Sequence, residues 1–477
     1  MPFQLRALPG LLLAGLLAAC DSGVQGFAFI SDVNGAYLPA GPVGSTYIVE
    51  GIQFGDTQGD ANVYFTNTLG GTALVAPVSS WANNFVVGTV PAGAVSGPLV
   101  LDNGNGPNNG LTFFAVLPAP TFTPASVSWT AGSSLPVGLS GHAVASGNLM
   151  HGTHAVYVLG GADSTDTPGN SVLFATAPAS GALGAWQATT SLSLPVAFHA
   201  AVVAVPSNSA VNSEGYLIAI GGATDKAGTS TNQIWRAPLN QDGTVGTWTR
   251  GAGDTLPVPL HSFGAVIFFG HLYIIGGQKS DNTPVNTVYR AVIKPDGSLL
   301  PNPWTVESPL PYPRSHFGYG QFNGVLYVVG GDSGKVTPND SLVTSSAVGD
   351  IHLAMVDLYS RDLKTGWVQS ANNLSIARSS ATAVVSGAPA APALLVSGGL
   401  FSTAPTGEET YAPVAAVGGA VGSLSAAANT INAQCGCKIF NQAATGYTTT
   451  DGTFHVIVVG GDDAAAPGKK RKQVYTY

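Results

Sequence analysis

Six Gly-Gly pairs recur from residue 160 onward at intervals of about sixty residues. Each pair closes a short apolar run, such as residues 155–159, that has the composition of a strand. The pairs are Gly160-Gly161, Gly221-Gly222, Gly276-Gly277, Gly330-Gly331, Gly398-Gly399 and Gly460-Gly461. A strand-built repeat of this length is typical of a β-propeller, in which each unit buries its apolar faces against its neighbours. The repeat therefore predicts an all-β fold with six blades.

Each repeat carries further elements in a constant order. A third-strand segment such as residues 286–291 follows the glycine pair, and then come a turn such as Asp296-Gly297, a tryptophan and a Leu-Pro step. The tryptophans are Trp186, Trp248, Trp304 and Trp367, and Leu424 takes this place in the fifth repeat. We expect each indole to pack between neighbouring blades, so the fifth blade should be the least well packed.

The order of these elements resembles the kelch family of β-propellers, and the resemblance covers about three-quarters of the chain. It implies a six-bladed ring with the candidate ligand site on one face, over the central channel. The longest insertions expected on that face are residues 332–350, 400–408 and 425–437, because loops on a rigid scaffold can vary freely. Residues 207–214 form an insertion on the opposite face.

The two ends of the repeat region are incomplete in complementary ways. Trp129 lies in an outer-strand segment that has no inner strands before it, whereas the chain stops after a third strand. Pairing Ser126–Ala131 with Lys472–Tyr477 completes the sixth blade and removes two exposed sheet edges. We therefore expect residues 126–477 to form a closed propeller.

Residues 28–117 have a different pattern, with short strands separated by turns every 8–12 positions. This pattern predicts a small β-sandwich. The segment also resembles the immunoglobulin-like IPT/TIG family in residues 49–55, Trp81, Val90-Pro91 and residues 113–116. The resemblance implies a spacer or interaction module. Residues 118–125 are rich in proline and predict a stiff linker.

The first nineteen residues have the features of an export signal. Arg6 precedes an apolar stretch over residues 8–17, which is too short to span a membrane as a mature helix. The sequence Leu17-Ala18-Ala19-Cys20 resembles the bacterial lipobox, which implies cleavage before Cys20 and acylation of that residue. We expect residues 1–19 to be a lipoprotein signal peptide and 20–27 a tether that anchors the chain in the cell envelope, on the periplasmic side of a membrane or at the cell surface.

Composition argues against nucleic acid as a partner. The formal net charge is −8 and only 9% of residues are charged, far below the roughly 25% of an average domain. The one basic run, residues 469–472, is short, whereas phosphate binding depends on clustered lysine and arginine. We expect a monomer that does not bind nucleic acid.

The remaining cysteines are Cys435 and Cys437, in a Cys-Gly-Cys sequence. An oxidising envelope allows them to form a local disulfide or to remain thiols. Two cysteines alone are weak evidence for a metal because structural zinc sites usually need four ligands. The sequence indicates no metal and no cofactor.

A histidine stands near the start of four successive inner strands: His142, His199, His261 and His316. Arg314 precedes the fourth histidine, and Arg378-Ser379 occupies the corresponding place in the fifth repeat. In the kelch family such residues line the channel mouth, which makes these seven the ligand-binding candidates. The alternative is a repeated structural residue whose imidazole bonds a neighbouring blade.

Evidence for catalysis is weaker. Copper-radical oxidases with kelch propellers need a cysteine cross-linked to a tyrosine, and the Cys-Gly-Cys loop does not supply one. Periplasmic N-acetylneuraminate epimerases imply a carboxylate acid/base beside an arginine. Glu307, Glu408 and Glu409 are available, but no spacing pairs them. We expect a lipid-anchored envelope protein that binds a glycan or a protein, with a sugar-modifying epimerase as the alternative.

Overall fold

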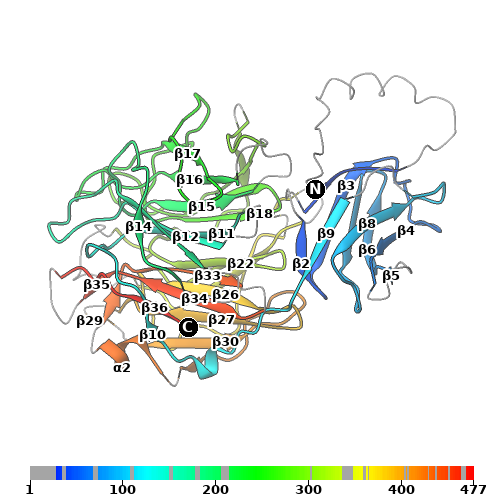
Figure 1. Cartoon of the computed structure of the whole chain (residues 1–477). Coiled ribbons are helices and arrows are strands. Elements are labelled where there is room, and N and C mark those ends of the chain that lie inside the picture. The colour runs from blue at the N-terminus through cyan, green and yellow to red at the C-terminus, as the bar shows by residue number, and fades with distance from the viewer. Residues whose placement is uncertain are drawn as a thin grey trace.

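A computed structural model describes most of the chain from residue 28 onward (Figure 1). The described residues are 28–34, 39–67, 74–107, 112–149, 154–177, 183–205, 214–300, 303–335, 347–357, 361–363, 365–401, 404–405, 408–427, 429–435, 438–448, 452–463 and 469–477. The predicted signal peptide, tether and lipidation site at Cys20 lie outside them. Within the described part the fold is all-β, and its only helices are the 3-10 turn η1 (Pro124–Ser126) and the one-turn α2 (Ile431–Cys435).

The first nine strands form two sheets that pack face to face. Their apolar core includes Tyr47 and Val86 from one sheet and Phe65, Leu99 and Phe114 from the other. One sheet has the order β1 (Phe29–Val33), β3 (Thr46–Ile52), β7 (Phe85–Thr89), β6 (Val78–Ala82). The other has the order β2 (Ala40–Pro42), β9 (Thr112–Leu117), β8 (Gly97–Asp102), β4 (Asn62–Phe65), β5 (Leu74–Val75). We call this unit the sandwich.

The rest of the chain forms six antiparallel sheets, numbered here along the chain. Sheet 1 contains β11 (Ala143–Asn148), β12 (His154–Leu159), β13 (Val172–Ala177) and β14 (Gln187–Ala188); sheet 2 contains β15 (Ala200–Ala204), β16 (Tyr216–Ile220) and β17 (Ile234–Pro238). Sheet 3 contains β18 (Gly264–Phe268), β19 (His271–Ile275), β20 (Val288–Val292) and β21 (Thr305–Glu307); sheet 4 contains β22 (Gly318–Phe322), β23 (Val325–Val329), β24 (Ile351–Met355) and β25 (Trp367–Gln369). Sheet 5 contains β26 (Thr382–Ala388), β27 (Ala391–Ser397), β30 (Glu409–Pro413) and β31 (Ser425–Ala426); sheet 6 contains β33 (Ala443–Thr448), β34 (Phe454–Val459), β36 (Val474–Thr476) and β10 (Thr130–Ala131). Two further pairs are β28 (Leu400–Phe401) with β29 (Ala404–Pro405), in the connection between β27 and β30, and β32 (Ile439–Phe440), which precedes β33, with β35 (Asp462–Asp463), which follows β34.

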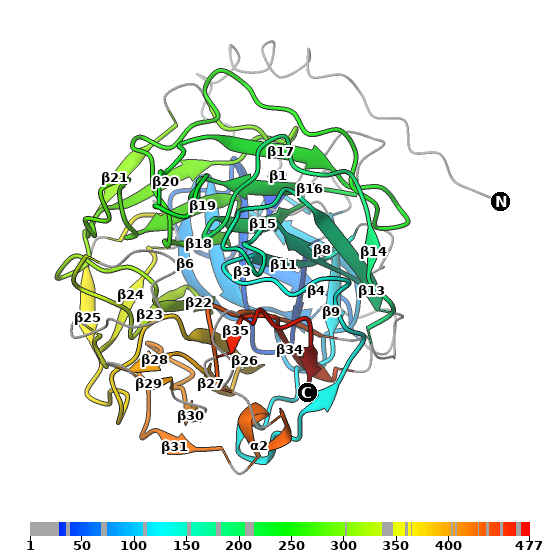
Figure 2. The same cartoon turned by 90° about the vertical axis from the view of Figure 1, so that its left-hand side faces the viewer.

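The six sheets surround a common centre (Figure 2). Their first strands, β11, β15, β18, β22, β26 and β33, are called the inner strands. Each inner strand contacts the next one, and β33 contacts β11, which closes the cycle. Six apolar clusters fill the spaces between successive sheets, including the space between sheets 6 and 1. This arrangement is compatible with a β-propeller, and it removes apolar surface from water on both faces of every sheet.

The two ends of the chain segment meet in sheet 6. Thr130 pairs with Thr476 and Ala131 with Tyr475. The side chains of Trp129 and Tyr475 are buried in the same cluster between sheets 5 and 6. The predicted pairing of the N-terminal outer strand with the C-terminal strand is confirmed.

The glycine pairs and the tryptophans connect neighbouring sheets. All twelve glycines have positive φ, a conformation that side chains disfavour. The indole nitrogens of four tryptophans each donate a hydrogen bond to a carbonyl of the preceding repeat, at 2.7–3.0 Å. These donors are Trp186, Trp248, Trp304 and Trp367. Their predicted position between sheets is thereby explained by packing and by a repeated hydrogen bond.

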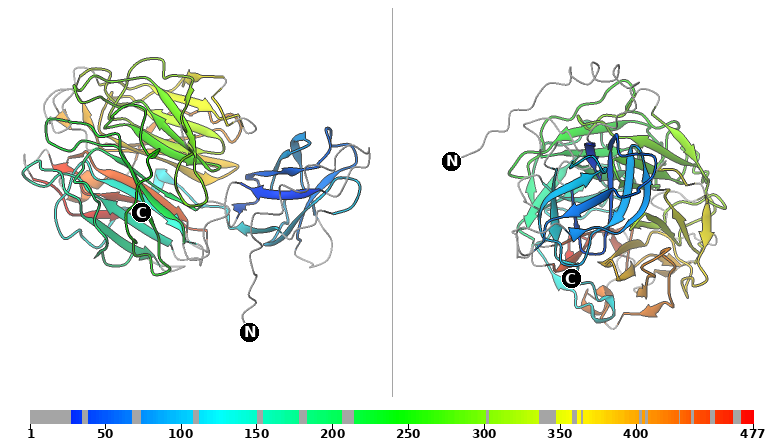
Figure 3. Two further views of the ribbon diagram at one scale, coloured as in Figure 1. Left: turned by 90° about the horizontal axis from the view of Figure 1, so that it is seen from above. Right: turned by 90° about the vertical axis from the view of Figure 1, so that its right-hand side faces the viewer.

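The sandwich packs against the hairpin turns at one end of the inner strands (Figure 3). The guanidinium of Arg361, from the segment between β24 and β25, forms an ion pair with Glu50 of the sandwich. It also lies 5.9 Å from the ring of Phe85 and 5.6 Å from that of Phe269, which belong to the sandwich and the β18–β19 turn. Arg361 therefore connects the two units through charge and through cation–π contacts.

Candidate functional site

Six residues, one just before or at the start of each inner strand, form a closed ring of backbone hydrogen bonds. Each residue donates its N–H to the carbonyl of the residue in the preceding sheet, with N···O distances of 2.6–3.2 Å. In chain order they are Gly141, Phe198, Ser262, His316, Ser380 and Asn441, and Gly141 closes the ring on Asn441. We call them the ring residues. The ring joins all six sheets at one end of the central channel.

Every ring residue has a positive φ, between 49° and 57°. Five of them have side chains, so the conformation costs about 1–3 kcal/mol at each position and persists only because the surrounding structure imposes it. A Cβ at Gly141 would lie 2.7 Å from the ring of Phe198, which covers this glycine. The ring is thus a strained feature held in place by six packed sheets.

The four predicted histidines do not occupy one repeated position. His316 is itself a ring residue, His142 and His199 follow ring residues, and His261 precedes one. The sequence placed them in one register because all four stand near the start of an inner strand. A difference of one or two residues places their side chains in two different environments.

His142 and His199 lie between sheets. A Cβ on Gly460 would come within 2.7 Å of Cε1 of His142, and one on Gly160 would come within 2.9 Å of Cε1 of His199, so each imidazole rests on the first glycine of the preceding pair. Phe263 covers Gly221 in the same way. Because phenylalanine replaces histidine at the equivalent position, the imidazole acts here as a flat packing group.

Burial keeps these two histidines neutral. It lowers the pKa of His142 to about 4 and that of His199 to about 3, and the neighbouring His142 contributes to the second shift. Both residues line the central cavity. The backbone of Val459 in sheet 6 interacts with the imidazole of His142 and opposes the shift of its pKa, whereas the imidazole of His199 has no hydrogen-bond partner among the described residues. Packing on a glycine of the neighbouring sheet supports the structural alternative for these two residues, and a hydrogen bond from the imidazole to a neighbouring blade stays a prediction.

His261 and His316 instead belong to a chain of side-chain hydrogen bonds across sheets 3 and 4. The hydroxyl of Ser262 lies 2.9 Å from Nδ1 of His261 and 2.8 Å from Nε2 of His316. Nδ1 of His316 lies 3.1 Å from the hydroxyl of Ser315, and Nε2 of His261 lies 3.3 Å from Oδ1 of Asn282. Burial lowers the pKa of His261 to about 4 and that of His316 to about 3, so both imidazoles are neutral at pH 7.

The chemistry of these groups gives the chain one direction. Asn282 presents an oxygen to Nε2 of His261, so this nitrogen carries the proton and Nδ1 accepts the hydroxyl proton of Ser262. Nε2 of His316 must then donate to Ser262, and its Nδ1 accepts from Ser315. In this arrangement Oγ of Ser262 keeps one lone pair that none of the described residues uses.

Arg314 and Arg378 are scaffold residues. Both are completely or almost completely buried, and each donates to the carbonyl of the first glycine in its own repeat, Gly330 or Gly398, at 3.2 Å. Arg378 also donates to the carbonyl of Glu408 at 2.7 Å. Neither arginine lines the cavity, so the structure separates them from the histidines.

Ser379 is buried and its backbone pairs with Leu400, whereas the next residue, Ser380, is the ring residue that lines the cavity. The sequence prediction named Ser379 and missed Ser380, Ser262 and Asn441. All three stand two residues before the first residue of an inner strand, and this constant spacing is the sequence feature that could have identified them. Backbone φ, which a sequence pattern does not reveal, distinguishes these neighbours.

The inner strands enclose a cavity of about 380 Å³ that the ring bounds at one end. Alanines, valines and Ile267 from the inner strands form much of its wall, together with Tyr319 and Thr382. Among the described lining residues none is Asp, Glu, Lys or Arg. The polar side chains of the cavity therefore carry hydroxyls, the amides of Asn441 and Gln442, and neutral imidazoles.

The buried carboxylates lie away from this cavity and serve the scaffold. Glu307 pairs with Arg290 and accepts the backbone N–H of Leu363 at 2.9 Å. Glu409 accepts the N–H of Ile431 at 3.0 Å and the indole N–H of Trp129 at 3.2 Å. Burial raises the pKa of Glu409 to about 7. These contacts hold neighbouring sheets together and form no acid/base pair in the cavity.

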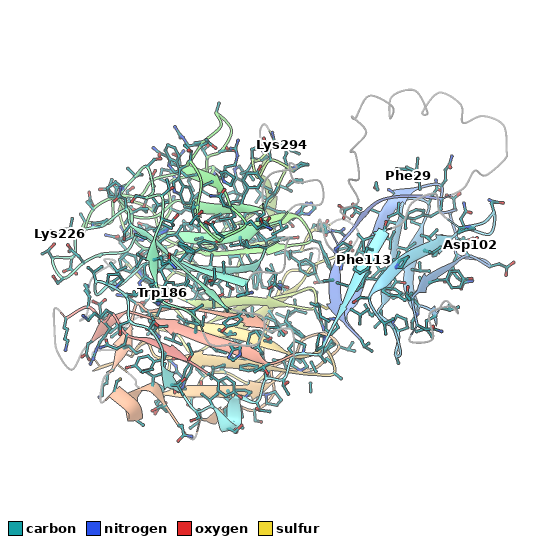
Figure 4. All side chains as sticks on the ribbon, in the orientation of Figure 1. Phe29, Asp102, Phe113, Trp186, Lys226 and Lys294 are labelled. Carbon is teal, nitrogen blue, oxygen red and sulfur yellow. The ribbon has the colours of Figure 1, made fainter. Side chains whose placement is uncertain are left out.

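Loops that follow the first three glycine pairs lie at the end of the sheets opposite the sandwich, as the position of Lys226 shows (Figure 4). We call residues 162–171, 223–233 and 278–287 the rim loops. Asp163, Asp225 and Asp281 each accept backbone N–H groups within their own loop, at 2.8–3.2 Å. These turns order exposed loops that carry polar side chains.

Several predicted features fall partly or wholly outside the described residues. Much of the predicted insertion at 332–350 and most of that at 207–214 lie outside them, as do Cys20 and Cys437. Cys435 is disulfide-bonded, and its pairing with Cys437 stays a prediction. Within the described ranges no group of three or more His, Cys, Asp or Glu is arranged to hold a metal ion, and no helix there has the length and apolar character needed to cross a membrane.

No protein-family model matches the chain, and a search of curated proteins finds no matching sequence.

Proposed function

We propose that residues 126–477 form a six-bladed β-propeller of the kelch type and that the sandwich is an IPT/TIG-like module. The closed cycle of inner strands, the twelve positive-φ glycines and the four inter-sheet indole bonds support this interpretation. The contact of the sandwich with the hairpin end leaves the rim loops on the opposite end. A spacer module at one end and rim loops at the opposite end suit a protein that exposes these loops to a binding partner.

The protein is, in this proposal, a lipid-anchored component of the cell envelope. The lipobox-like sequence ending at Cys20 supports the anchor, because several acyl chains on one residue give firm attachment whereas one chain binds only marginally. The sandwich then holds the propeller away from the membrane. Its ion pair with Arg361 and the adjoining aromatic contacts support a defined orientation.

The propeller binds a glycan or another envelope protein through the rim loops. The observation that carries this proposal is that no charged side chain lines the described central cavity. Arg314 and Arg378 instead bind backbone carbonyls, and Glu307 and Glu409 connect neighbouring sheets. An epimerase would need a carboxylate and an arginine facing one substrate. Binding by ordered polar loops requires neither.

A matched pair of lysines tests the proposal. Lys226 lies in a rim loop and Lys294 lies nearer the sandwich (Figure 4). The full-length chain and the variants Lys226→Ala and Lys294→Ala are applied to a glycan array and to purified envelope proteins. We expect saturable binding that Lys226→Ala weakens and Lys294→Ala does not. Absence of binding together with faster interconversion of sialic-acid anomers than in buffer refutes the binding function in favour of an epimerase.

A further inference from the structure

The cavity between the inner strands is a second feature with the properties of a ligand site, separate from the rim loops. Its volume of about 380 Å³ falls within the usual range for small-molecule sites. The ring residues bound one end of it, and the hairpin end lies beside the sandwich. We propose that this cavity binds a small uncharged molecule with a hydroxyl or similar hydrogen-bond donor on an aliphatic body.

The hydrogen-bond chain through Ser262 determines which polar group the ligand needs. The hydroxyl proton of Ser262 is donated to His261, and His316 donates to the same oxygen. One lone pair of Oγ remains, so the site can accept a proton from a ligand. Ser380 also lines the cavity and is a second hydroxyl-bearing residue of the ring. An alcohol on the ligand supplies the donor that Oγ of Ser262 can accept.

The rest of the wall determines the ligand body. Small aliphatic side chains from five of the six sheets line it, including Ala145, Val203, Ile267, Ala383 and Ala444, and sheet 4 contributes Tyr319. Such a wall favours apolar groups because their removal from water is the main source of binding free energy. An alkyl chain therefore fits along the inner strands.

The same wall rejects an anion. No cationic side chain lines the described cavity, and the buried guanidiniums of Arg314 and Arg378 are hydrogen-bonded to carbonyls of residues that do not line it. Burying a carboxylate without a cationic partner is costly, whereas a hydroxyl loses little once it is hydrogen-bonded. The site should therefore distinguish an alcohol from a carboxylate of the same chain length.

The test uses 1-octanol and octanoate as probes at pH 7.5, with the purified full-length chain and isothermal titration calorimetry. We expect saturable 1:1 binding of 1-octanol and affinity for octanoate weaker by about a hundredfold or more. Equal binding of the two probes, or no binding of 1-octanol up to its solubility limit, overturns the proposal. Neither result depends on whether the rim loops bind a glycan or a protein.

Variants locate the site. Ser262→Ala removes the accepting oxygen and should weaken 1-octanol binding about fivefold, the effect of one typical hydrogen bond. Ser308→Ala is the matched control, because this half-buried serine donates to Leu363 outside the cavity. Thr382→Phe adds a phenyl group to the wall and should abolish binding, which keeps the test decisive if Ser262→Ala does not fold. Unchanged binding in both Ser262→Ala and Thr382→Phe refutes the assignment.

Discussion

Replacing His199 with phenylalanine should make the fold less sensitive to acid without changing its stability at neutral pH. His199 is 7% exposed and packs on Gly160, and the equivalent Phe263 packs on Gly221 in the same way. The His199→Phe variant therefore copies a side chain that the repeat already accommodates. At pH 7 both side chains are neutral, so we expect the free energy of unfolding to change by less than about 1 kcal/mol.

The acid effect follows from the difference in pKa between the folded and unfolded chains. Burial lowers the pKa of His199 to about 3 in the folded state, against about 6.5 when unfolded. The unfolded chain therefore binds a proton that the folded chain excludes once the pH falls below about 6.5. Stability is fully present above that pH and is lost progressively down to about pH 3. At pH 4 the loss from this one histidine is about 3 kcal/mol, because each pKa unit is worth about 1.4 kcal/mol.

Urea unfolding followed by tryptophan fluorescence at pH 7 and pH 4 measures this difference. Between those pH values the wild-type chain should lose about 3 kcal/mol more than His199→Phe. The reciprocal variant Phe263→His is the matched control, and it should gain an acid sensitivity of similar size. Identical losses in the wild type and in His199→Phe would show that this imidazole is not held neutral by burial, and the packing role assigned to it would fail.

Three other substitutions test the scaffold. In the wild type the carboxyl of Glu409 keeps its proton to about pH 7 when folded but not when unfolded, so the free energy of unfolding should decline by about 3 kcal/mol between pH 4.5 and 7. Glu409→Gln should remove this decline, and a decline that persists in the variant contradicts the assignment. Arg378→Gln should cost about 3 kcal/mol or more in urea unfolding, since three acceptors, two of them buried, lose a charged donor. Unchanged stability would return this arginine to the ligand-binding candidates. Arg361→Met should separate the thermal unfolding of the sandwich from that of the six sheets, as a calorimeter can detect, because it removes the ion pair to Glu50; a single unchanged transition argues that other contacts couple the two units.

Much of the architecture could be predicted because its determinants are local. Apolar runs closed by glycine pairs predict strands and turns from a few adjacent residues. The incomplete repeats at Trp129 and at the C-terminus predicted the pairing that Thr130 and Thr476 show. Regular spacing was sufficient there because the unpaired strand at each end of the repeat region leaves an exposed sheet edge, and pairing the two strands removes both edges.

The candidate site could be predicted only in part. The sequence placed functional residues near the starts of the inner strands, and three of the four histidines do line the cavity. It did not distinguish His316, which is in the ring, from His142, which packs beside it. It also assigned Arg314 and Arg378 to the channel mouth, whereas their guanidiniums turn to the carbonyls of Gly330 and Gly398. These outcomes depend on the direction of a side chain after a positive-φ residue, and that direction is set by the neighbouring sheet.

By itself the sequence determined that this chain builds strands, where they turn and that its ends belong together, because periodicity and glycine act over short distances. Tertiary structure alone decided the hydrogen-bonded ring and the uncharged cavity. The donors and acceptors of the ring belong to different repeats, and they meet only when all six sheets pack around one axis. Their positive φ angles are tolerated for the same reason, because the packing of the six sheets imposes this backbone conformation despite its strain.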